Sequence, residues 1–427
     1  MLPITSYWEV DDVKKFLAAI FATTILMTGC GDENISKDDK NTFIYGTVSY
    51  GEPMETMGTN PHENYSGWST LRYGIGETLF KFNDNMELEP WLAESFERLD
   101  DYTIRIKIKD NVKFSNGKDV NGIAVKRCLE TLVAVHDRAP KDLELDSIIA
   151  NGNFVTIKSK EKVPSILNYL SDPYACIIDV NAGEIDNIVV GTGPYKAVVA
   201  DYAHIELVPN ENYWGEVKPK LKRIIVRGIN DGDTLAIGMY NGEFDAVQGV
   251  PFTTLKMFVN GYKISRVNTS RVYQITFNFD TPELQDINVR RAISMAIDKE
   301  NFTKVLLEDN GTIAVGAFPA NMPFGDEKVN APSYNLINAR KLLAAAGWQD
   351  TNGDGYVDKD GKNLELRYLT YTLRPELPML AGVTQADLKL IGIKLEVNAT
   401  NDYRHFLEKG EYDLYCNSIV TAPTGDP

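Results

Sequence analysis

The chain has 427 residues and a formal net charge of −16, with 44 Lys and Arg residues against 60 Asp and Glu. Such an acidic balance argues against nucleic acid as a partner. The length exceeds what a single hydrophobic core usually holds, so two or three domains are expected. With four Cys and four His, widely spaced, neither a disulfide framework nor a multi-histidine metal site is indicated.

A lysine pair opens a short apolar run near the N-terminus, in KKFLAAIFATTILMTGCGDE at residues 14–33. The run is shorter than the roughly 20 residues of a membrane-spanning helix and is typical of an export signal. It ends in LMTGC, which resembles a bacterial lipobox. We therefore expect a signal peptide at residues 1–29 and lipidation of Cys30. The alternative is a buried apolar helix with a chance cysteine.

Acidic residues precede this signal, although an export signal should begin with net positive charge. They are Glu9, Asp11 and Asp12. Translation starting at Val13 would remove the conflict, and residues 1–12 would then not belong to the protein. After the signal, the polar residues 30–44 are expected to form a flexible tether behind the lipid anchor.

Strands and helices alternate irregularly along the rest of the chain. Period-two or β-rich stretches predict strands at 43–51, 103–110, 154–160, 204–210, 221–229, 273–279 and close to the C-terminus. Helical spacing predicts helices at 67–82, 122–135, 287–307 and 338–348. Within them, Asp298 is expected to cap a second helix and Gly347 to end the last one. The pattern is mixed α/β without a repeat.

The helix predicted at 67–82 rests on Trp68, Leu71, Ile75 and Leu79, which recur at helical spacing. In the helix at 122–135, Cys128 is expected to be a small buried apolar residue.

One acidic loop resembles the front of a calcium-binding loop, with Asp350, Asn352, Asp354 and Asp358 around Gly355. Its twelfth position is Gly361, where an EF-hand needs a bidentate glutamate. A tight polar turn, in which Asp and Asn bond to the local backbone, is the alternative that we favour.

Two glycine pairs, Gly74 with Gly76 and Gly191 with Gly193, are incomplete as dinucleotide-binding motifs. We interpret them as turns or points of close packing. No phosphate-binding loop and no nucleophile–histidine pair is evident, so nothing in the sequence indicates an enzyme.

Aromatic and charged residues stand in loops and at helix starts, where they suit a cleft that stacks on a small polar solute and anchors a carboxylate. They are Tyr65, Trp68, Arg72, Trp91, Trp214 and Tyr403. For each aromatic residue taken singly, a place in the core is the alternative that we favour.

Several stretches in this order resemble extracellular solute-binding protein family 5, the binding lipoproteins of peptide, nickel and metallophore ABC importers. They are NPHENYSGWSTLRYGIGETLFKF, LEPWLAESFE, IKDNVKFSNG, GTGPYK, PNENYWG, VRRAISMAIDKE and AAAGWQDTNGDGYVDKDG. The resemblance runs from about residue 42 to the end. It implies a two-lobed clamshell with mixed sheets flanked by helices and an extra inserted subdomain.

The resemblance also implies domain limits. Lobe I would hold residues 45–84 and 191–280, with 85–190 as its inserted subdomain, and lobe II would hold 281–427. Members of the family are longer, so the resemblance implies that lobe II is incomplete here.

The same resemblance suggests solute-binding residues. Asp172 stands where the nickel and metallophore branch has an arginine that holds a carboxylate, and Arg138 is a candidate for a second arginine of that branch. Tyr403 matches a cleft tyrosine, and Tyr65, Trp68 and Arg72 complete the set. Arg72 or Arg138 is then the expected anionic anchor, with an exposed, ion-paired arginine as the alternative for each.

We therefore expect the solute-binding component of an ABC importer, capturing a di- or oligopeptide or a nickel or other metal chelate, without enzymatic activity or a cofactor of its own. The expected partners are a permease and its ATPase, with a monomer anchored by lipid on the extracytoplasmic face of the membrane or in the periplasm. A calcium-dependent surface adhesion module or a surface hydrolase is the alternative.

Overall fold

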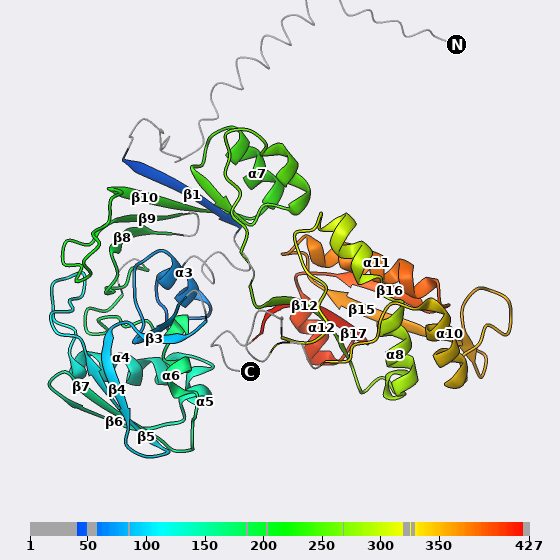
Figure 1. Ribbon diagram of the computed structural model, residues 1–427, viewed down its shortest axis with the longest axis horizontal. Helices are drawn as coiled ribbons and strands as arrows, with labels where there is room; N and C mark the ends of the chain where they lie inside the picture. The colour runs from blue at the N-terminus through cyan, green and yellow to red at the C-terminus, as the bar shows by residue number, and fades with distance from the viewer. Residues whose placement is uncertain are drawn as a thin grey trace, which may run out of the picture. The chain divides into compact units, whose positions relative to one another are not determined.

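The computed structural model describes residues 41–48, 58–83, 86–184, 187–201, 204–267, 269–318, 325 and 329–421 (Figure 1). The predicted signal peptide, Cys30 and most of the predicted tether lie outside these residues. No helix in the described part of the chain is both long and apolar enough to span a bilayer.

The first sheet is mixed and has the order β11-β1-β10-β9-β8. Its strands are β1 (Thr42–Val48), β8 (Tyr195–Ala200), β9 (His204–Pro209), β10 (Arg223–Ile229) and β11 (Ala246–Gln248). Strand β1 runs parallel to both β10 and β11, while the β10–β9 and β9–β8 pairs are antiparallel. Helix α7 (Gly232–Tyr240) packs Leu235 against Ile44 of β1, and η2 (Phe252–Met257) follows β11.

A second sheet is fully antiparallel, in the order β4-β5-β7-β6. Its strands are β4 (Ala93–Arg98), β5 (Thr103–Ile108), β6 (Leu145–Asn151) and β7 (Phe154–Ser159). The helices α4 (Gly122–Val135), α5 (Ala139–Leu143) and α6 (Ile166–Tyr169) and the turn η1 (Pro173–Ala175) accompany it. Strict alternation in β5 buries Ile104, Ile106 and Ile108 on one face.

One continuous core joins these two sheets, since it contains Ile106 and Val155 of the second sheet together with Ile205 and Val226 of the first. Helix α3 (Ser66–Arg72) and the hairpin of β2 (Phe80–Phe82) and β3 (Leu88–Pro90) link them along the chain. We refer to this unit as the first lobe.

The third sheet has the order β12-β17-β15-β16 and a core of its own. Its strands are β12 (Arg271–Phe277), β15 (Glu365–Thr370), β16 (Lys394–Ala399) and β17 (Leu414–Val420). Around it stand η3 (Pro282–Gln285), α8 (Ile287–Ala296), α9 (Lys299–Asn301), η4 (Phe302–Leu306), α10 (Leu336–Ala345), α11 (Glu376–Lys389) and α12 (Tyr403–Lys409), with a small hairpin of β13 (Asp358–Lys359) and β14 (Lys362–Asn363). We refer to this unit as the second lobe.

Strand β12 pairs along its whole length with β17 of the second lobe, from Arg271 opposite Val420 to Phe277 opposite Leu414. The expected start of lobe II at residue 281 would separate these two strands. We propose instead that the boundary lies before Arg271.

The structure confirms the mixed α/β class, the predicted strands and the helix at 122–135, where Cys128 is buried. The predicted helix at 67–82 is wrong beyond Arg72. Gly74 adopts a φ of +70°, which ends the helix, and Ile75 and Leu79 are buried outside it. Their helical spacing reflects burial of both residues in the same core.

The two glycine pairs pack directly on each other, as the interpretation of close packing predicts. The backbone N–H of Gly193 donates to the carbonyl of Ile75 at 3.0 Å, and a Cβ on Gly193 would lie 2.1 Å from the carbonyl oxygen of Gly74. Only glycine allows this approach of two backbones.

The substitution Gly193→Ala is therefore expected to lower the free energy of unfolding by about 3 kcal/mol, since a backbone oxygen blocks the added methyl group. Urea denaturation measures the change. The matched control is Gly382→Ala in α11, where a Cβ meets no atom within 4 Å and alanine is the better helix former. Equal stability of the two variants would contradict the packing argument.

Candidate functional site

A cavity of about 2590 Å³ is lined by residues of both lobes. Its wall includes all six residues that the sequence analysis singled out for solute binding, namely Tyr65, Trp68, Arg72, Arg138, Asp172 and Tyr403. Their role in binding stays a prediction, while their position around one cavity, five on the first lobe and Tyr403 on the second, is a feature of the structure.

On the first lobe, helix α3 supplies Trp68 and Arg72, and Tyr65 stands at its N-cap. Gly67 rests on the backbone of Pro173, where a Cβ would lie 2.6 Å from the carbonyl oxygen. A hydrogen bond also holds α3 in place: the hydroxyl of the buried Thr70 donates to the carbonyl of Thr59 at 2.6 Å. The buried side of α3 is thus fixed, and Tyr65 and Trp68 remain 56% and 36% exposed.

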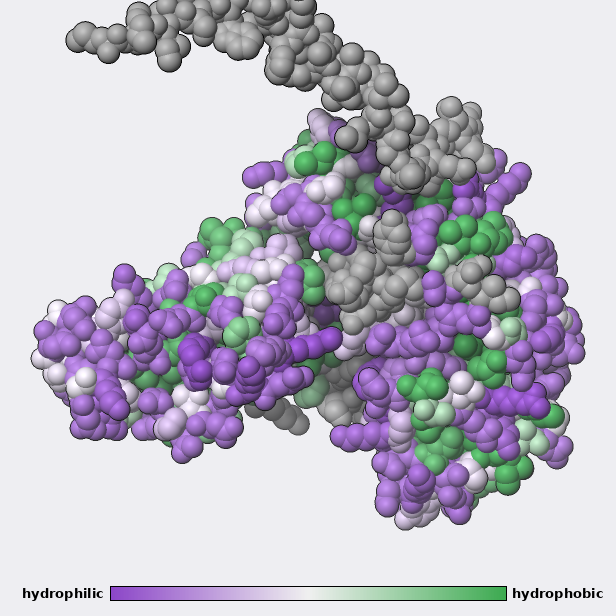
Figure 2. Space-filling model, turned by 180° about the vertical axis from the view of Figure 1, so that it is seen from behind, coloured by the Kyte–Doolittle hydropathy of each residue, from purple (hydrophilic) through white to green (hydrophobic). Residues whose placement is uncertain are grey.

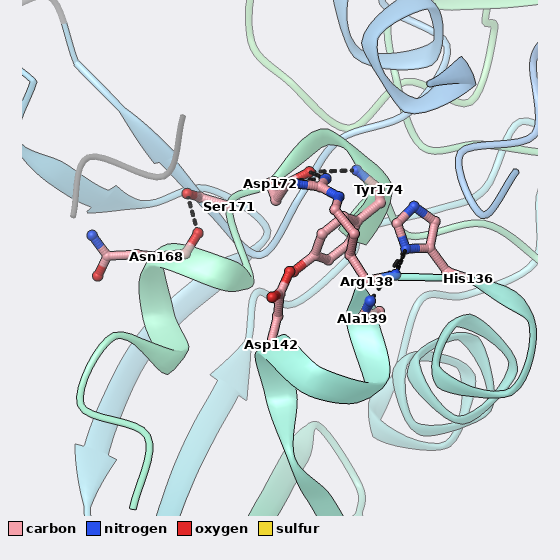
Figure 3. A network of polar contacts seen from close by, with 8 residues as sticks. All are labelled: His136, Arg138, Ala139, Asp142, Asn168, Ser171, Asp172 and Tyr174. Atoms are coloured by element: carbon pink, nitrogen blue, oxygen red, sulfur yellow. Dashed lines mark hydrogen bonds and ion pairs between the residues drawn. The ribbon is translucent and has the colours of Figure 1, made fainter. Parts of the chain in front are cut away.

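Arg138 and Asp172 form an ion pair beside α3 (Figure 3). The Nη2 atom of Arg138 lies 3.2 Å from both carboxylate oxygens of Asp172. Asp172 also caps η1 by accepting the backbone N–H of Tyr174 at 3.2 Å. Burial raises the pKa of the Asp172 carboxyl, and the charge of Arg138 opposes that rise. The pair joins the two positions that the resemblance selected separately.

The residues that hold Arg138 in place were not predicted from the sequence. The Arg138 guanidinium carbon lies 5.0 Å from the ring centre of Tyr174, whose hydroxyl donates to Asp142 at 3.0 Å. The Nδ1 atom of His136 accepts the backbone N–H groups of Arg138 and Ala139, each at 3.2 Å. These contacts join separate segments of the chain, so no local sequence pattern predicts them.

Tyrosines form the corresponding wall of the second lobe, where Tyr403 alone was predicted. The Tyr403 ring lies 5.0 Å from Tyr371 and is stacked 6.1 Å from Tyr415. The Tyr371 hydroxyl accepts the backbone N–H of Ser418 at 3.1 Å, which fixes it on β17. Tyr371 and Tyr403 line the cavity together with Arg374 and Arg404.

Charge in the cavity wall has the opposite balance to charge in the whole chain. Among the described residues, eight basic ones line it, namely Arg72, Arg138, Lys263, Arg266, Arg271, Lys299, Arg374 and Arg404. The acidic residues of the described wall are five, namely Asp172, Asp245, Asp309, Glu376 and Asp402. A basic wall in a protein of charge −16 favours a solute with negative groups.

Trp91 and Trp214 do not line this cavity; they lie in a separate small groove of the first lobe, so the interpretation of these two as cleft residues is wrong. Trp214 donates its Nε1–H to Glu77 at 2.7 Å. Burial raises the pKa of Glu77 to about 6, against the opposing effect of that hydrogen bond. Trp214 packs against the core of the first lobe, and the Trp91 ring lies beneath the ammonium group of Lys81.

The calcium-like loop uses its carboxylates on its own backbone. Asp350 accepts the N–H groups of Gly353 and Gly355 at 2.7 and 3.0 Å, and Asp354 accepts that of Tyr356 at 2.8 Å. Asp358 is buried and bonded to Thr351. Across the described residues, no group of three or more His, Cys, Asp and Glu side chains could hold a metal ion. These contacts favour the polar turn over a calcium site.

Residues 87–427 match the family of bacterial extracellular solute-binding proteins, family 5 Middle. The chain belongs to this family. Similarity to individual members extends over most of the chain. It is 29% identical over 419 residues to the nickel-binding protein NikA of Staphylococcus aureus, which covers 96% of this chain and 80% of that protein. It is 28% identical over 370 residues to the oligopeptide-binding protein AppA of Bacillus subtilis, covering 82% of this chain and 67% of that protein.

The fold agrees with this membership. The structure of NikA from Staphylococcus aureus in complex with Ni(L-His)2 is similar with a TM-score of 0.76 and 27% identity, over 90% of this chain and 79% of that one. The two-lobed fold expected from the sequence is thereby confirmed, as is the resemblance to family 5.

A buried histidine gives the first lobe a predicted acid sensitivity. Burial, together with the charge of His136, lowers the pKa of His62 from 6.5 to about 4. The folded state disfavours protonation of His62. The contribution of neutral His62 to the free energy of unfolding is therefore fully present above pH 6.5 and is lost as the pH falls toward 4. The wild type should lose on the order of 3 kcal/mol of its free energy of unfolding over that pH range, and His62→Gln should not show this loss.

Urea unfolding of both proteins between pH 7 and pH 4 measures this loss, and His405→Gln, at an exposed position, is the control. An identical pH dependence in the wild type and His62→Gln would contradict the assignment to His62.

Proposed function

We propose that this protein is the solute-binding component of an ABC importer, and that it captures a peptide or a metal chelate in the cavity and delivers it to a membrane permease. The observation that carries the proposal is the wall itself, which combines exposed aromatic rings with arginines from both lobes. Rings offer stacking surfaces and guanidinium groups hold carboxylates, so the wall suits a solute that has both planar and anionic parts.

Binding would proceed by closure of the two lobes on the solute, without bond-breaking chemistry. The carboxylates of the calcium-like loop are bonded to its own backbone, and no observation favours the adhesion or hydrolase alternative. The membership of family 5 supports the same conclusion, because it is a family of solute-binding proteins.

If the solute is a metal complex, we propose that the metal enters with its own ligands. No His or Cys side chain is among the described residues that line the cavity, although these are the side chains that nickel and other transition metals prefer. Aromatic and arginine contacts would then recognise the outside of the chelate, and a bare metal ion would bind poorly.

The test is the change in thermal midpoint with nickel chloride alone, nickel with excess L-histidine, and a set of short peptides, followed by calorimetry of any probe that binds. Trp68→Ala and Tyr403→Ala should each weaken binding about tenfold, because each removes a stacking surface of the wall. Trp91→Ala, outside the cavity, is the matched control and should bind as the wild type does. Unchanged affinity in both cavity variants would contradict the proposed site.

One face of the molecule is suited to water. Figure 2 shows one face that is mostly hydrophilic, with hydrophobic residues gathered in separate small patches. We propose a monomer that is held on the extracytoplasmic face of the membrane by acylated Cys30, with a tether shortened to residues 31–41 because strand β1 begins at Thr42.

For this anchor, Cys30→Ser is expected to move the protein from the detergent phase to the aqueous phase in Triton X-114 partition of cells expressing the full chain, because the acyl chain is lost. Mass spectrometry of the wild type should find a modified Cys30 as the first residue. An unmodified chain that begins before Cys30 would overturn the lipoprotein assignment.

A further inference from the structure

Asp172 is the acidic residue most completely withdrawn from the cavity it lines. Its side chain is 2% exposed, whereas that of Arg138 is 48% exposed. A solute therefore meets the guanidinium and not the carboxylate. The carboxylate lies behind it at 3.2 Å, close enough to cancel most of its charge.

Arg138 keeps hydrogen-bonding capacity for a solute despite this pairing. Both of its contacts to Asp172 use Nη2. Within the described part of the chain, Nε and Nη1 donate to no other group. Tyr174 supports one face of the guanidinium, and His136 holds its backbone. The remaining N–H groups can donate hydrogen bonds to a solute carboxylate in a fixed direction.

We propose that Asp172 sets the charge selectivity of the cavity: it positions Arg138 to bind a carboxylate while making that anchor electrically neutral, so that solutes with additional negative charge are disfavoured. The inference rests on the proposed function and goes beyond it, because it assigns a selectivity role to a residue that the solute does not need to touch. A simple structural role as the cap of η1 is the competing explanation.

Two pairs of probes separate charge from shape. The EDTA complexes of Fe(III) and Ni(II) share one chelator, and the nickel complex carries one more negative charge. The peptides Ala-Ala-Asn and Ala-Ala-Asp are nearly isosteric and differ in the same way. Calorimetry gives a selectivity ratio for each pair, defined as affinity for the more anionic member divided by affinity for the less anionic one.

Asp172→Asn keeps an oxygen that can cap η1 and removes the charge, so the ratio should rise about threefold or more. Arg138→Gln alters a half-exposed side chain and leaves the carboxylate, so the ratio should fall. The control Asp142→Asn removes the same charge from the same network, but Asp142 does not line the cavity and contacts Tyr174 instead of Arg138. Its ratio should stay close to that of the wild type.

Opposite shifts in the Asp172 and Arg138 variants support the proposal, and the ratio is insensitive to a general loss of stability, which lowers both affinities together. Circular dichroism and the thermal midpoint without solute verify that each variant is folded. If Asp172→Asn does not fold, the predicted fall in the Arg138→Gln ratio still decides the matter.

Unchanged ratios in a protein that binds the probes would overturn the charge-selectivity proposal alone. Failure of the wild type to bind any of the four probes would count against the proposed function as well, and so the two failures can be told apart.

Discussion

The binding wall of the first lobe depends on one backbone contact, the approach of Gly67 to Pro173. A Cβ at Gly67 would lie 2.6 Å from the carbonyl oxygen of Pro173, so any other residue would separate α3 from η1. Helix α3 has only seven residues and no side-chain cap at Tyr65, and such a helix has little stability of its own. It is held by what it packs against. This contact therefore places the aromatic residues of α3 beside the Arg138–Asp172 pair.

A second set of close contacts fixes the same region from the other side. Gly191 and Gly193 lie on the carbonyl groups of Ile75 and Gly74, and the backbone N–H of Glu77 donates to Thr192. The chain enters and leaves the second sheet through these residues, so the sheet and its helices are held firmly to α3. Because Arg138 follows α4 and Asp172 precedes η1, their position relative to Trp68 is set by backbone contacts. The wall is then largely preorganised for a solute.

Local periodicity predicted much of the fold, and it failed where tertiary contacts override it. The alternation of Ile104, Ile106 and Ile108 marked β5 correctly, since one face of that strand is buried. The spacing of Ile75 and Leu79 suggested a helix that Gly74 ends. The six candidate residues came from the pattern of aromatic and charged residues and from the family resemblance, and all of them line the one cavity. Their partners Tyr174 and Tyr371 were missed, because ring and ion-pair contacts between distant segments leave no periodic signal.

The electrostatics of the cavity wall differ from those of the chain as a whole. In the part of the cavity wall that the structure describes, eight basic residues stand against five acidic ones, whereas the chain has a net charge of −16. The arginines of the wall nevertheless differ in how far neighbouring acidic groups neutralise them. Arg138 is neutralised by Asp172 and contributes direction more than charge, whereas Arg72, in the last turn of α3, is in no ion pair with another described residue. Within the described wall no histidine is present, and His62 and His136 have lowered pKa values behind it. No histidine of the described wall can therefore change its charge near neutral pH.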